Sequence, residues 1–258
     1  MAVIMVSVIS GLFAGFGTGF AGLSAAVFIA PMLIAFLKVD SFSAIGIALA
    51  SDVLASVASA CNYRRYGNVN LRKNMILLVT VLVFAIIGSI IAYFFTAYEE
   101  GESIMGWWMI AATLVLGLKL LLFPGNRERA RKGSEGLSDT LIMIGSGIYI
   151  GFVCGFQGTG GGLMLLFVLN ILLGNEFKKA VGTSVSIMAL TAFIGAASHF
   201  TLRGFPDIRL LILCIVFTFI GAEIASVIAN KVRPEVLKRI TGGMMSVAGI
   251  AMIIARFL

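Results

Sequence analysis

The sequence predicts an all-α polytopic membrane protein. Three observations support this prediction: 60% of the 258 residues are hydrophobic and only 12% are charged, the mean hydropathy is +1.07, and apolar runs of spanning length recur along the chain. An ordinary soluble domain has about 25% charged residues, so that class is excluded. Strands are excluded as the spanning element, because barrel strands are about 10 residues long and alternate in polarity.

Two stretches without any charged residue, Met1–Leu37 and Thr140–Asn175, dominate this pattern. Each has roughly 36 residues, which is too many for one span of about 20 residues and too few for two spans with a turn. A glycine-rich segment lies near the middle of each stretch, Gly15–Gly22 in the first and Gly155–Gly162 in the second. We therefore expect a helix that breaks at these glycines and then either returns or continues. Met1–Leu37 lacks the features of a signal peptide, so we expect it in the mature protein.

Six further apolar runs are predicted to be membrane spans. They are Ser43–Tyr63, Asn74–Ala97, Ile104–Phe123, Ala180–Leu202, Leu210–Asn230 and Ile240–Ala255. The long polar stretch Pro124–Gly136 is expected to be a cytoplasmic linker. It divides a single transmembrane domain, residues 1–258, into a first repeat (1–123) and a second repeat (137–258).

The two halves resemble each other in sequence. The matching segments are Ala44–Gly46 with Ala180–Gly182, Tyr66–Arg72 with Arg203–Arg209, and Ile87–Ile90 with Ile220–Glu223. Each half is therefore expected to contain one glycine-broken stretch followed by three spans.

The distribution of basic residues distinguishes two topologies, because cytoplasmic loops carry an excess of Lys and Arg. Eight alternating transmembrane helices would leave 11 basic residues on one side and 7 on the other. If each glycine stretch is a re-entrant hairpin, Lys119 lies within a span, 14 of the 19 basic residues share one side, and the other side keeps four: Lys38, Arg203, Arg209 and Arg256. The re-entrant topology separates the basic residues between the two sides more completely than eight alternating helices do. It predicts two inverted repeats with both termini outside, a recurring design of secondary transporters.

Three functions compete for the glycine-rich segments. Several of the glycines have GxxxG spacing, which allows close helix packing. Gly17–Gly22 matches the nucleotide-binding pattern G-x-G-x-x-G, but that motif needs a preceding strand in a soluble unit and is rejected. The third function is oxyanion binding at a new helix N-terminus, where free N–H groups and the positive end of the dipole favour negative charge. We favour this one, with helices that follow over Leu23–Leu37 and Leu163–Leu173. The predicted substrate-binding residues are Gly17, Thr18, Gly19, Gln157, Gly158, Thr159, Gly160, Gly161 and Gly162.

The pattern resembles the TauE/SafE family of membrane transporters, often described as sulfite exporters. The likeness is carried by Gly155–Gly162, Ala180–Ser184, His199 with Gly204–Asp207, and the span with Gly221 and Glu223. The first half departs from the pattern, with Gly46-Ile47-Ala48 in place of Gly-Thr-Ser and Tyr63 in place of His. The resemblance implies a plasma-membrane transporter for small sulfur oxyanions such as sulfite or sulfoacetate.

A few polar residues are predicted to lie inside the membrane. Asp52 and Glu223 are candidates for proton coupling, because a carboxylate at that depth is protonated, paired or in contact with water. A structural acid bonded to a neighbouring helix is the alternative. His199, the only histidine, is a candidate proton carrier or an interfacial side chain. Thr183 and Ser184 could line the substrate cavity, or bond back to their own helix.

The sequence thus predicts a secondary transporter that moves a small sulfur-containing oxyanion by alternating access. The expected partners are this anion, the lipid bilayer and coupling protons, and not nucleic acid. Cys61, Cys154 and Cys214 are expected to be packing thiols, so no metal site or cofactor is predicted. Catalytic motifs are lacking, which argues against the alternative of an intramembrane enzyme. A non-transporting accessory protein is the other alternative.

Overall fold

A computed structural model describes residues 2–95, 137–157 and 161–257, together with residues 114, 115, 118, 121 and 122. Every regular element in these ranges is helical, which confirms the all-α prediction. Five of the described helices are long and apolar enough to cross a membrane, and three shorter apolar helices accompany them. The linker 124–136 and most of Ile104–Phe123 lie outside the described residues.

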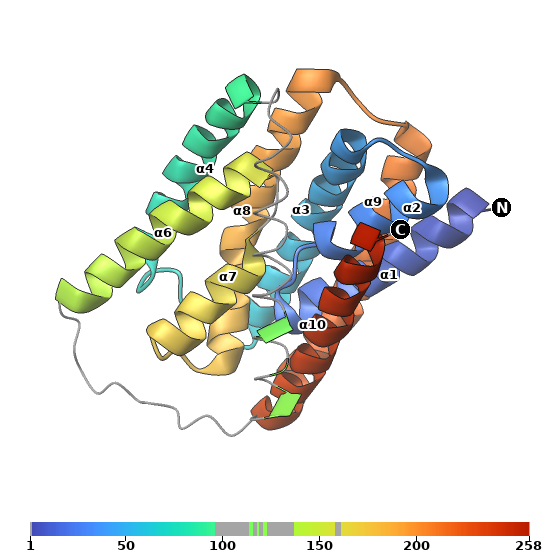
Figure 1. Cartoon of the computed structure of the whole chain (residues 1–258). Coiled ribbons are helices and arrows are strands. Elements are labelled where there is room, and N and C mark those ends of the chain that lie inside the picture. Colours follow the sequence, from blue (N-terminus) through green and yellow to red (C-terminus); the bar gives the residue numbers. More distant parts are fainter. Residues whose placement is uncertain are drawn as a thin grey trace.

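The first half contains α1 (Ala2–Ala21), α2 (Ala26–Leu37), α3 (Ser41–Arg65) and α4 (Met75–Phe95). The second half contains α6 (Leu137–Gln157), α7 (Gly162–Phe167), the π-helix η1 (Val168–Leu172), α8 (Phe177–Arg203), α9 (Ile208–Lys231) and α10 (Pro234–Phe257). Figure 1 shows α4 and α6 on one side of the bundle, α1, α2, α9 and α10 on the other, and α3 and α8 between them.

In each glycine-rich stretch, the described helices before and after the glycines run in opposite directions and are here called a helical hairpin. α1 ends at Ala21, Gly22 adopts a left-handed conformation with φ +64°, and α2 runs back against α1 (Figure 1). In the second half α7 runs opposite to α6, and Gly161, also with φ +64°, precedes α7. The two hairpins have the geometry that a re-entrant topology requires. Their orientation in a bilayer remains a prediction.

The position of the first break differs from the expectation. α1 continues through Gly15, Gly17 and Gly19, and α2 begins at Ala26 rather than Leu23. The reason is packing: ideal β-carbons at Gly11 and Gly19 would lie 2.9 Å from Phe217 Cβ and 2.6 Å from Ala225 Cβ of α9. This close approach stabilises a helix that glycine propensity alone would weaken.

The second half uses the same device. Gly147, Gly151 and Gly155 of α6 face α4, where a β-carbon at Gly147 would lie 2.8 Å from Thr80 Cβ. α1 therefore packs against α9 as α6 packs against α4, while α3 and α8 pack against each other in the centre. In each pair, the first helix of one half packs against a later helix of the other half. Reciprocal pairs of this kind are expected if the halves are related by a two-fold axis. The GxxxG interpretation is thus correct for these glycines.

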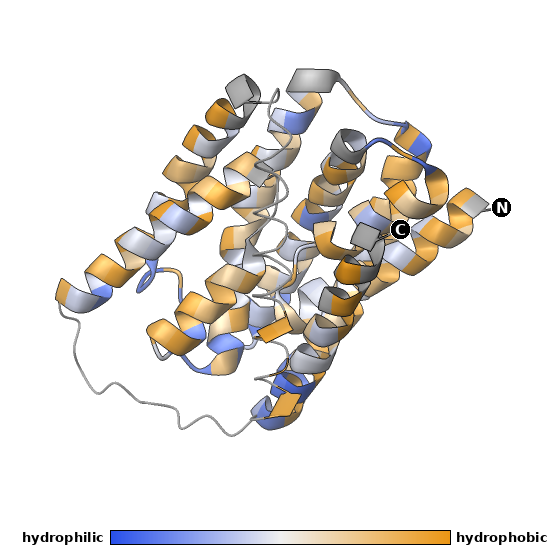
Figure 2. Cartoon of the chain, in the orientation of Figure 1, coloured by the Kyte–Doolittle hydropathy of each residue, from blue (hydrophilic) through white to orange (hydrophobic). Residues whose placement is uncertain are grey.

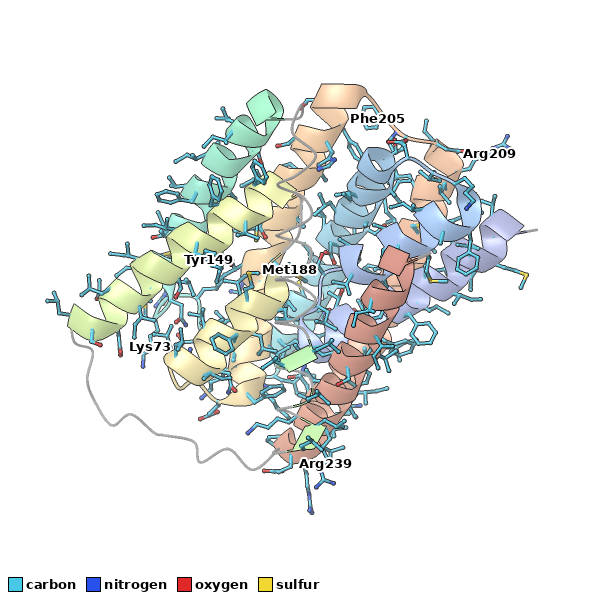
Figure 3. The ribbon with its side chains drawn as sticks, in the orientation of Figure 1. Lys73, Tyr149, Met188, Phe205, Arg209 and Arg239 are labelled. Carbon is cyan, nitrogen blue, oxygen red and sulfur yellow. The ribbon has the colours of Figure 1, made fainter. Side chains whose placement is uncertain are left out.

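Polar residues gather in the loops at the two ends of the helices, whose bodies are apolar (Figure 2). At one end, here called the basic end, the Lys178 ammonium donates to the Asn230 carbonyl (2.7 Å) and Asn68 donates to the Asn230 side chain (2.7 Å). These bonds join the α3–α4 loop to the start of α8 and the end of α9. Figure 3 shows Lys73 and Arg239 at this end and Arg209 at the opposite end. The described basic residues at the basic end are Arg64, Arg65, Arg72, Lys73, Lys178, Lys179, Lys231, Arg233, Lys238 and Arg239.

Candidate functional site

Asp52 of α3 holds the turn of the first hairpin. Its carboxylate is fully buried and accepts hydrogen bonds from Ser24 Oγ (2.5 Å), the Ala25 N–H (2.8 Å) and Thr18 Oγ1 (3.4 Å). We call residues Gly22–Ala25 the first tip. Asp52 is 11 residues into α3, which corresponds to roughly 16 Å, or about half of a bilayer core. The first tip is therefore fixed deep inside the bundle by an acidic side chain.

The same carboxylate occupies the anion position at the N-terminus of α2. The Ala25 N–H points to Asp52, and the next N–H, of Ala26, bonds to Ser24 Oγ at 3.3 Å. A negative group is favoured there by the free donors and the helix dipole. The predicted helix N-terminus therefore exists in the first half, but the protein's own carboxylate fills it.

The predicted binding residues of the first segment lie inside α1. Gly17, Thr18 and Gly19 are helical, so their N–H groups belong to the helix and are not free donors as expected. Gly19 packs against α9, and the Thr18 hydroxyl lies 2.8 Å from the Leu23 carbonyl. These residues shape the first tip, and their assignment to a substrate remains a prediction.

We call the turn between α6 and α7 the second tip; among the described residues, no carboxylate contacts it as Asp52 contacts the first tip. The sequence match of Ala44 with Ala180 places Met188 of α8 where α3 has Asp52. A β-carbon at Gly162 would lie 2.5 Å from Met188 Sδ. Gly161 and Gly162 are the described residues of this tip, Gln157 is the last residue of α6, and Gly158, Thr159 and Gly160 lie outside the described residues. The two tips are thus chemically different.

The structure brings the two tips together. The Gly22 carbonyl oxygen lies where a side chain at Gly162 would be, and a β-carbon at Gly22 would lie 2.8 Å from Ser184 Oγ. Ser184 is fully buried, and its hydroxyl donates to the Val181 carbonyl of its own helix at 2.8 Å, which is the back-bonding alternative expected from the sequence. Of the predicted site residues, Gly162 and Ser184 therefore both lie against Gly22, whereas a β-carbon at Gly161 would meet Cys154 and Ile150 of α6. Thr183 does not join them directly, because its hydroxyl accepts a hydrogen bond from the Asn70 N–H (3.0 Å).

A polar face of α3, not anticipated from the sequence, extends from Asp52 toward the basic end. Asp52, Ser56, Ser59 and Tyr63 are spaced by four, three and four residues, so they share one helix face, and all four are 0% exposed. Tyr63 donates to the Gly19 carbonyl at 3.0 Å. The Ser56 and Ser59 hydroxyls find no hydrogen-bond partner in the described part of the chain. Their helical spacing from Asp52 was the available signal in the sequence.

The other two coupling candidates lie apart from Asp52. Glu223 of α9 is half-buried and accepts a hydrogen bond from Asn62 Nδ2 (2.9 Å), which also contacts Ser226 Oγ (2.9 Å). His199 lies near the start of α3, where a β-carbon at Gly46 would be 3.4 Å from His199 Cβ. Asp52, Glu223 and His199 therefore do not form one cluster.

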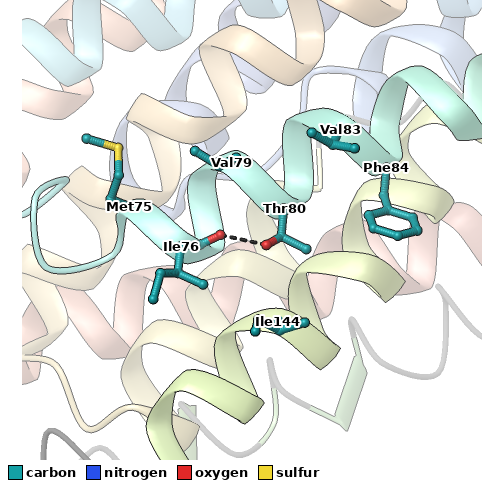
Figure 4. A pocket seen from close by; sticks show the side chains of 7 residues that line it. All are labelled: Met75, Ile76, Val79, Thr80, Val83, Phe84 and Ile144. Carbon is teal, nitrogen blue, oxygen red and sulfur yellow. Dashed lines mark hydrogen bonds between the residues drawn. The ribbon is translucent and has the colours of Figure 1, made fainter. Parts of the chain in front are cut away.

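An apolar groove of about 500 Å³ opens on α4 and α6, on the outer side of the bundle (Figure 4). The residues that line it are Met75, Ile76, Val79, Thr80, Val83, Phe84 and Ile144. The Thr80 hydroxyl is bonded to the Ile76 carbonyl at 2.7 Å, so it is not presented to a ligand. This groove suits lipid acyl chains and is no oxyanion site.

Comparison with known proteins finds membrane transporters, in agreement with the all-helical, apolar structure. The probable membrane transporter protein YdhB of Bacillus subtilis is 26% identical over 258 residues, covering 98% of this chain and 100% of YdhB. The probable membrane transporter protein YunE of the same organism is 25% identical over 250 residues, with 90% and 91% coverage. No solved structure matches. The family model described as sulfite exporter TauE/SafE matches residues 7–252, which include both hairpins. The chain therefore belongs to the TauE/SafE family of membrane transporters.

Proposed function

We propose that this protein is a secondary transporter that carries a small sulfur oxyanion, such as sulfite or an organosulfonate, across the cytoplasmic membrane. The observation that carries the proposal is the contact between the tips of the two hairpins at Gly22 and Gly162, beside the buried Ser184 side chain. Helix breaks that meet deep inside a bundle are where secondary transporters bind their substrates. The family name supports a sulfur oxyanion as the substrate class.

The proposed topology places the basic end in the cytoplasm and both termini outside. Ten of the described basic residues lie at that end, while Arg209 lies at the opposite one (Figure 3). Each half then enters as a re-entrant hairpin and adds three spans, so the halves insert in opposite orientations. Alternating access would arise from the movement of the two halves around the tips.

Asp52 is the proposed coupling group. In its charged form it occupies the N-terminus of α2 through the Ala25 N–H, the position that an oxyanion would also favour. Protonation removes that charge and weakens the bond, because hydrogen bonds to ionised acceptors are roughly twice as strong as neutral ones. A protonated Asp52 would then yield the helix N-terminus to the substrate. The protein would therefore bind a proton at Asp52 and an anion at the N-terminus of α2 in the same state.

The test is flux. Purified protein in proteoliposomes should exchange labelled sulfite, thiosulfate or sulfoacetate across the membrane, and a pH gradient should drive accumulation of the transported anion. Protein that is folded but moves none of these compounds would sink the proposal and favour an accessory role. If a pH gradient does not change anion accumulation, proton coupling is excluded, but the proposed anion transport is not.

A further inference from the structure

Two serines on the polar face of α3 have buried hydroxyls without a hydrogen-bond partner. Ser56 and Ser59 are 0% exposed, and neither hydroxyl meets a donor or an acceptor within the described part of the chain. Ser51 of the same helix is equally buried, but its hydroxyl donates to the Ile47 carbonyl at 2.8 Å, the usual arrangement for a serine inside a helix. A buried hydroxyl without a partner is costly, so Ser56 and Ser59 call for a ligand that donates and accepts hydrogen bonds.

The two serines lie between two polar groups whose partners are known. One turn before Ser56, the Asp52 carboxylate is held at the first tip. One turn after Ser59, the Asn62 amide donates to Glu223 Oε2 at 2.9 Å, three residues before the end of α3. Glu223 is only half-buried, so this end of the polar face reaches the margin of the bundle at the basic end. The unpartnered hydroxyls therefore fill the interval between a deep acid and a partly exposed one.

The spacing along this face fits single water molecules. Side chains three or four positions apart on a helix have their Cβ atoms about 5–6 Å from each other. One O–H···O bond spans about 2.7–2.8 Å, so two such bonds through one water span about 5.5 Å. We infer that ordered water molecules bound by Ser56 and Ser59 form a file along α3 that connects Asp52 with the basic end.

The charges around this water file favour water and protons over an anion. α1, α2, α8 and α9 pack against α3, and α1 and α2 contain no titratable side chain. Of the groups on α9, Glu223 faces the file, whereas Cys214 bonds to Ser7 of α1. The other titratable residues of α8 and α9 are in the first or last two turns of these helices: Lys178, Lys179, His199, Arg203, Arg209 and Lys231. The file thus has a carboxylate near each end and no cation along its length.

Resting on the proposed function, the water file gives the coupling proton a route to Asp52 from the basic end. The first tip closes the other side of the carboxylate, because Ser24 Oγ donates to it at 2.5 Å and Thr18 Oγ1 lies 3.4 Å away. Membrane transporters carry protons along chains of this kind, in which acidic groups are joined by hydrogen bonds. Ser56 and Ser59 act by positioning the water and do not contact the transported anion.

Hydroxyl-radical footprinting tests for the water directly, because radicals formed from ordered internal water modify the side chains beside it. Tyr63, one turn beyond Ser59, is 0% exposed. In proteoliposomes without substrate, we expect Tyr63 to be modified in the unmutated protein and about fivefold less in Ser59→Ala. Ser198→Ala, whose hydroxyl bonds to its own helix, should change the labelling less than twofold. An unlabelled Tyr63, or equal labelling in Ser59→Ala, overturns the inference. Ser56→Ala replaces this variant if Ser59→Ala fails to fold.

Infrared spectroscopy tests the connection to Asp52. The band of its protonated carboxyl, identified by its loss in Asp52→Asn, should shift when D₂O replaces H₂O. This exchange should slow about tenfold or more in a protein that combines Ser56→Ala with Ser59→Ala. An unchanged rate, or a carboxyl that gives no protonated band at acidic pH, overturns the proton route.

Neither measurement requires a transported anion, so the two proposals can fail separately. Protein that passes both tests but moves no sulfur oxyanion retains the water file and loses the proposed function. Protein that transports the anion but leaves Tyr63 unlabelled loses the water file alone.

Discussion

The carbonyl oxygen of Gly22 lies directly against the α-carbon of Gly162, so closely that no side chain fits at Gly162. These residues are far apart in the sequence and belong to the tips of different hairpins. Their contact means that a movement of either half changes the same small region. Two buried polar side chains lie next to this contact: Ser184 of α8, and Asp52 of α3, which accepts a hydrogen bond from the Ala25 N–H of the first tip.

The contact between the tips predicts the effect of a single methyl group. Gly162→Ala would place its β-carbon against the Gly22 carbonyl and 2.5 Å from Met188 Sδ, which forces the tips apart. We expect anion exchange in proteoliposomes to fall about tenfold or more, which corresponds to about 1.4 kcal/mol in the barrier. The melting temperature should also fall.

Gly145→Ala is the matched control, because Gly145 is in the interior of α6 and a β-carbon there meets no atom within 4 Å. Its stability should rise by roughly 0.5–1 kcal/mol, the usual gain from replacing a helical glycine. Normal exchange by folded Gly162→Ala protein would show that transport does not depend on the contact.

Replacing Asp52 by Asn should separate exchange from coupling. Asn cannot carry the negative charge that occupies the α2 N-terminus, so it mimics the protonated acid. Labelled anion should still exchange across vesicles at equal pH, while accumulation driven by a pH gradient should disappear. If Asp52→Asn retains gradient-driven accumulation, Asp52 is a structural acid, and Glu223 and His199 become the next candidates.

The serines on the polar face of α3 give a test in which stability and function diverge. The Ser56 and Ser59 hydroxyls have no described partner, so Ser56→Ala and Ser59→Ala remove no hydrogen bond within the described protein. We expect the free energy of unfolding to stay within about 1 kcal/mol or to rise, because a buried hydroxyl without a partner is costly. Exchange should nevertheless fall several-fold if these hydroxyls meet water or substrate. Unaltered exchange in both variants would exclude that role. Ser198→Ala, whose hydroxyl bonds to its own helix, serves as the control.

The proposed topology can be checked with single cysteines in a background without Cys61, Cys154 and Cys214. An impermeant thiol reagent added to intact cells should label a cysteine at Arg209 and leave one at Lys231 unlabelled, because both are exposed but lie at opposite ends of α9. Permeabilised cells should give labelling at both. Labelling of position 231 in intact cells would reverse the predicted orientation.

The sequence alone determined the class of the protein. The hydrophobic composition and the recurring apolar runs specify membrane-spanning helices, because a span of about 20 apolar residues has few other solutions. The two uncharged stretches also favoured hairpins over eight alternating spans. Their length fits neither one span nor two, and the basic residues segregate best if each stretch returns. These signals depend on length, composition and charge, which a single chain displays directly.

The tertiary structure decided which glycines pack against a neighbouring helix, which glycine forms a turn, and which polar groups have hydrogen-bond partners. Glycine supports both close helix packing and a left-handed turn, so spacing alone could not separate Gly15 and Gly19, which pack on α9, from Gly22, which turns the chain. Asp52 was visible as a membrane acid, but its bond to the Ala25 N–H joins helices that only folding brings together.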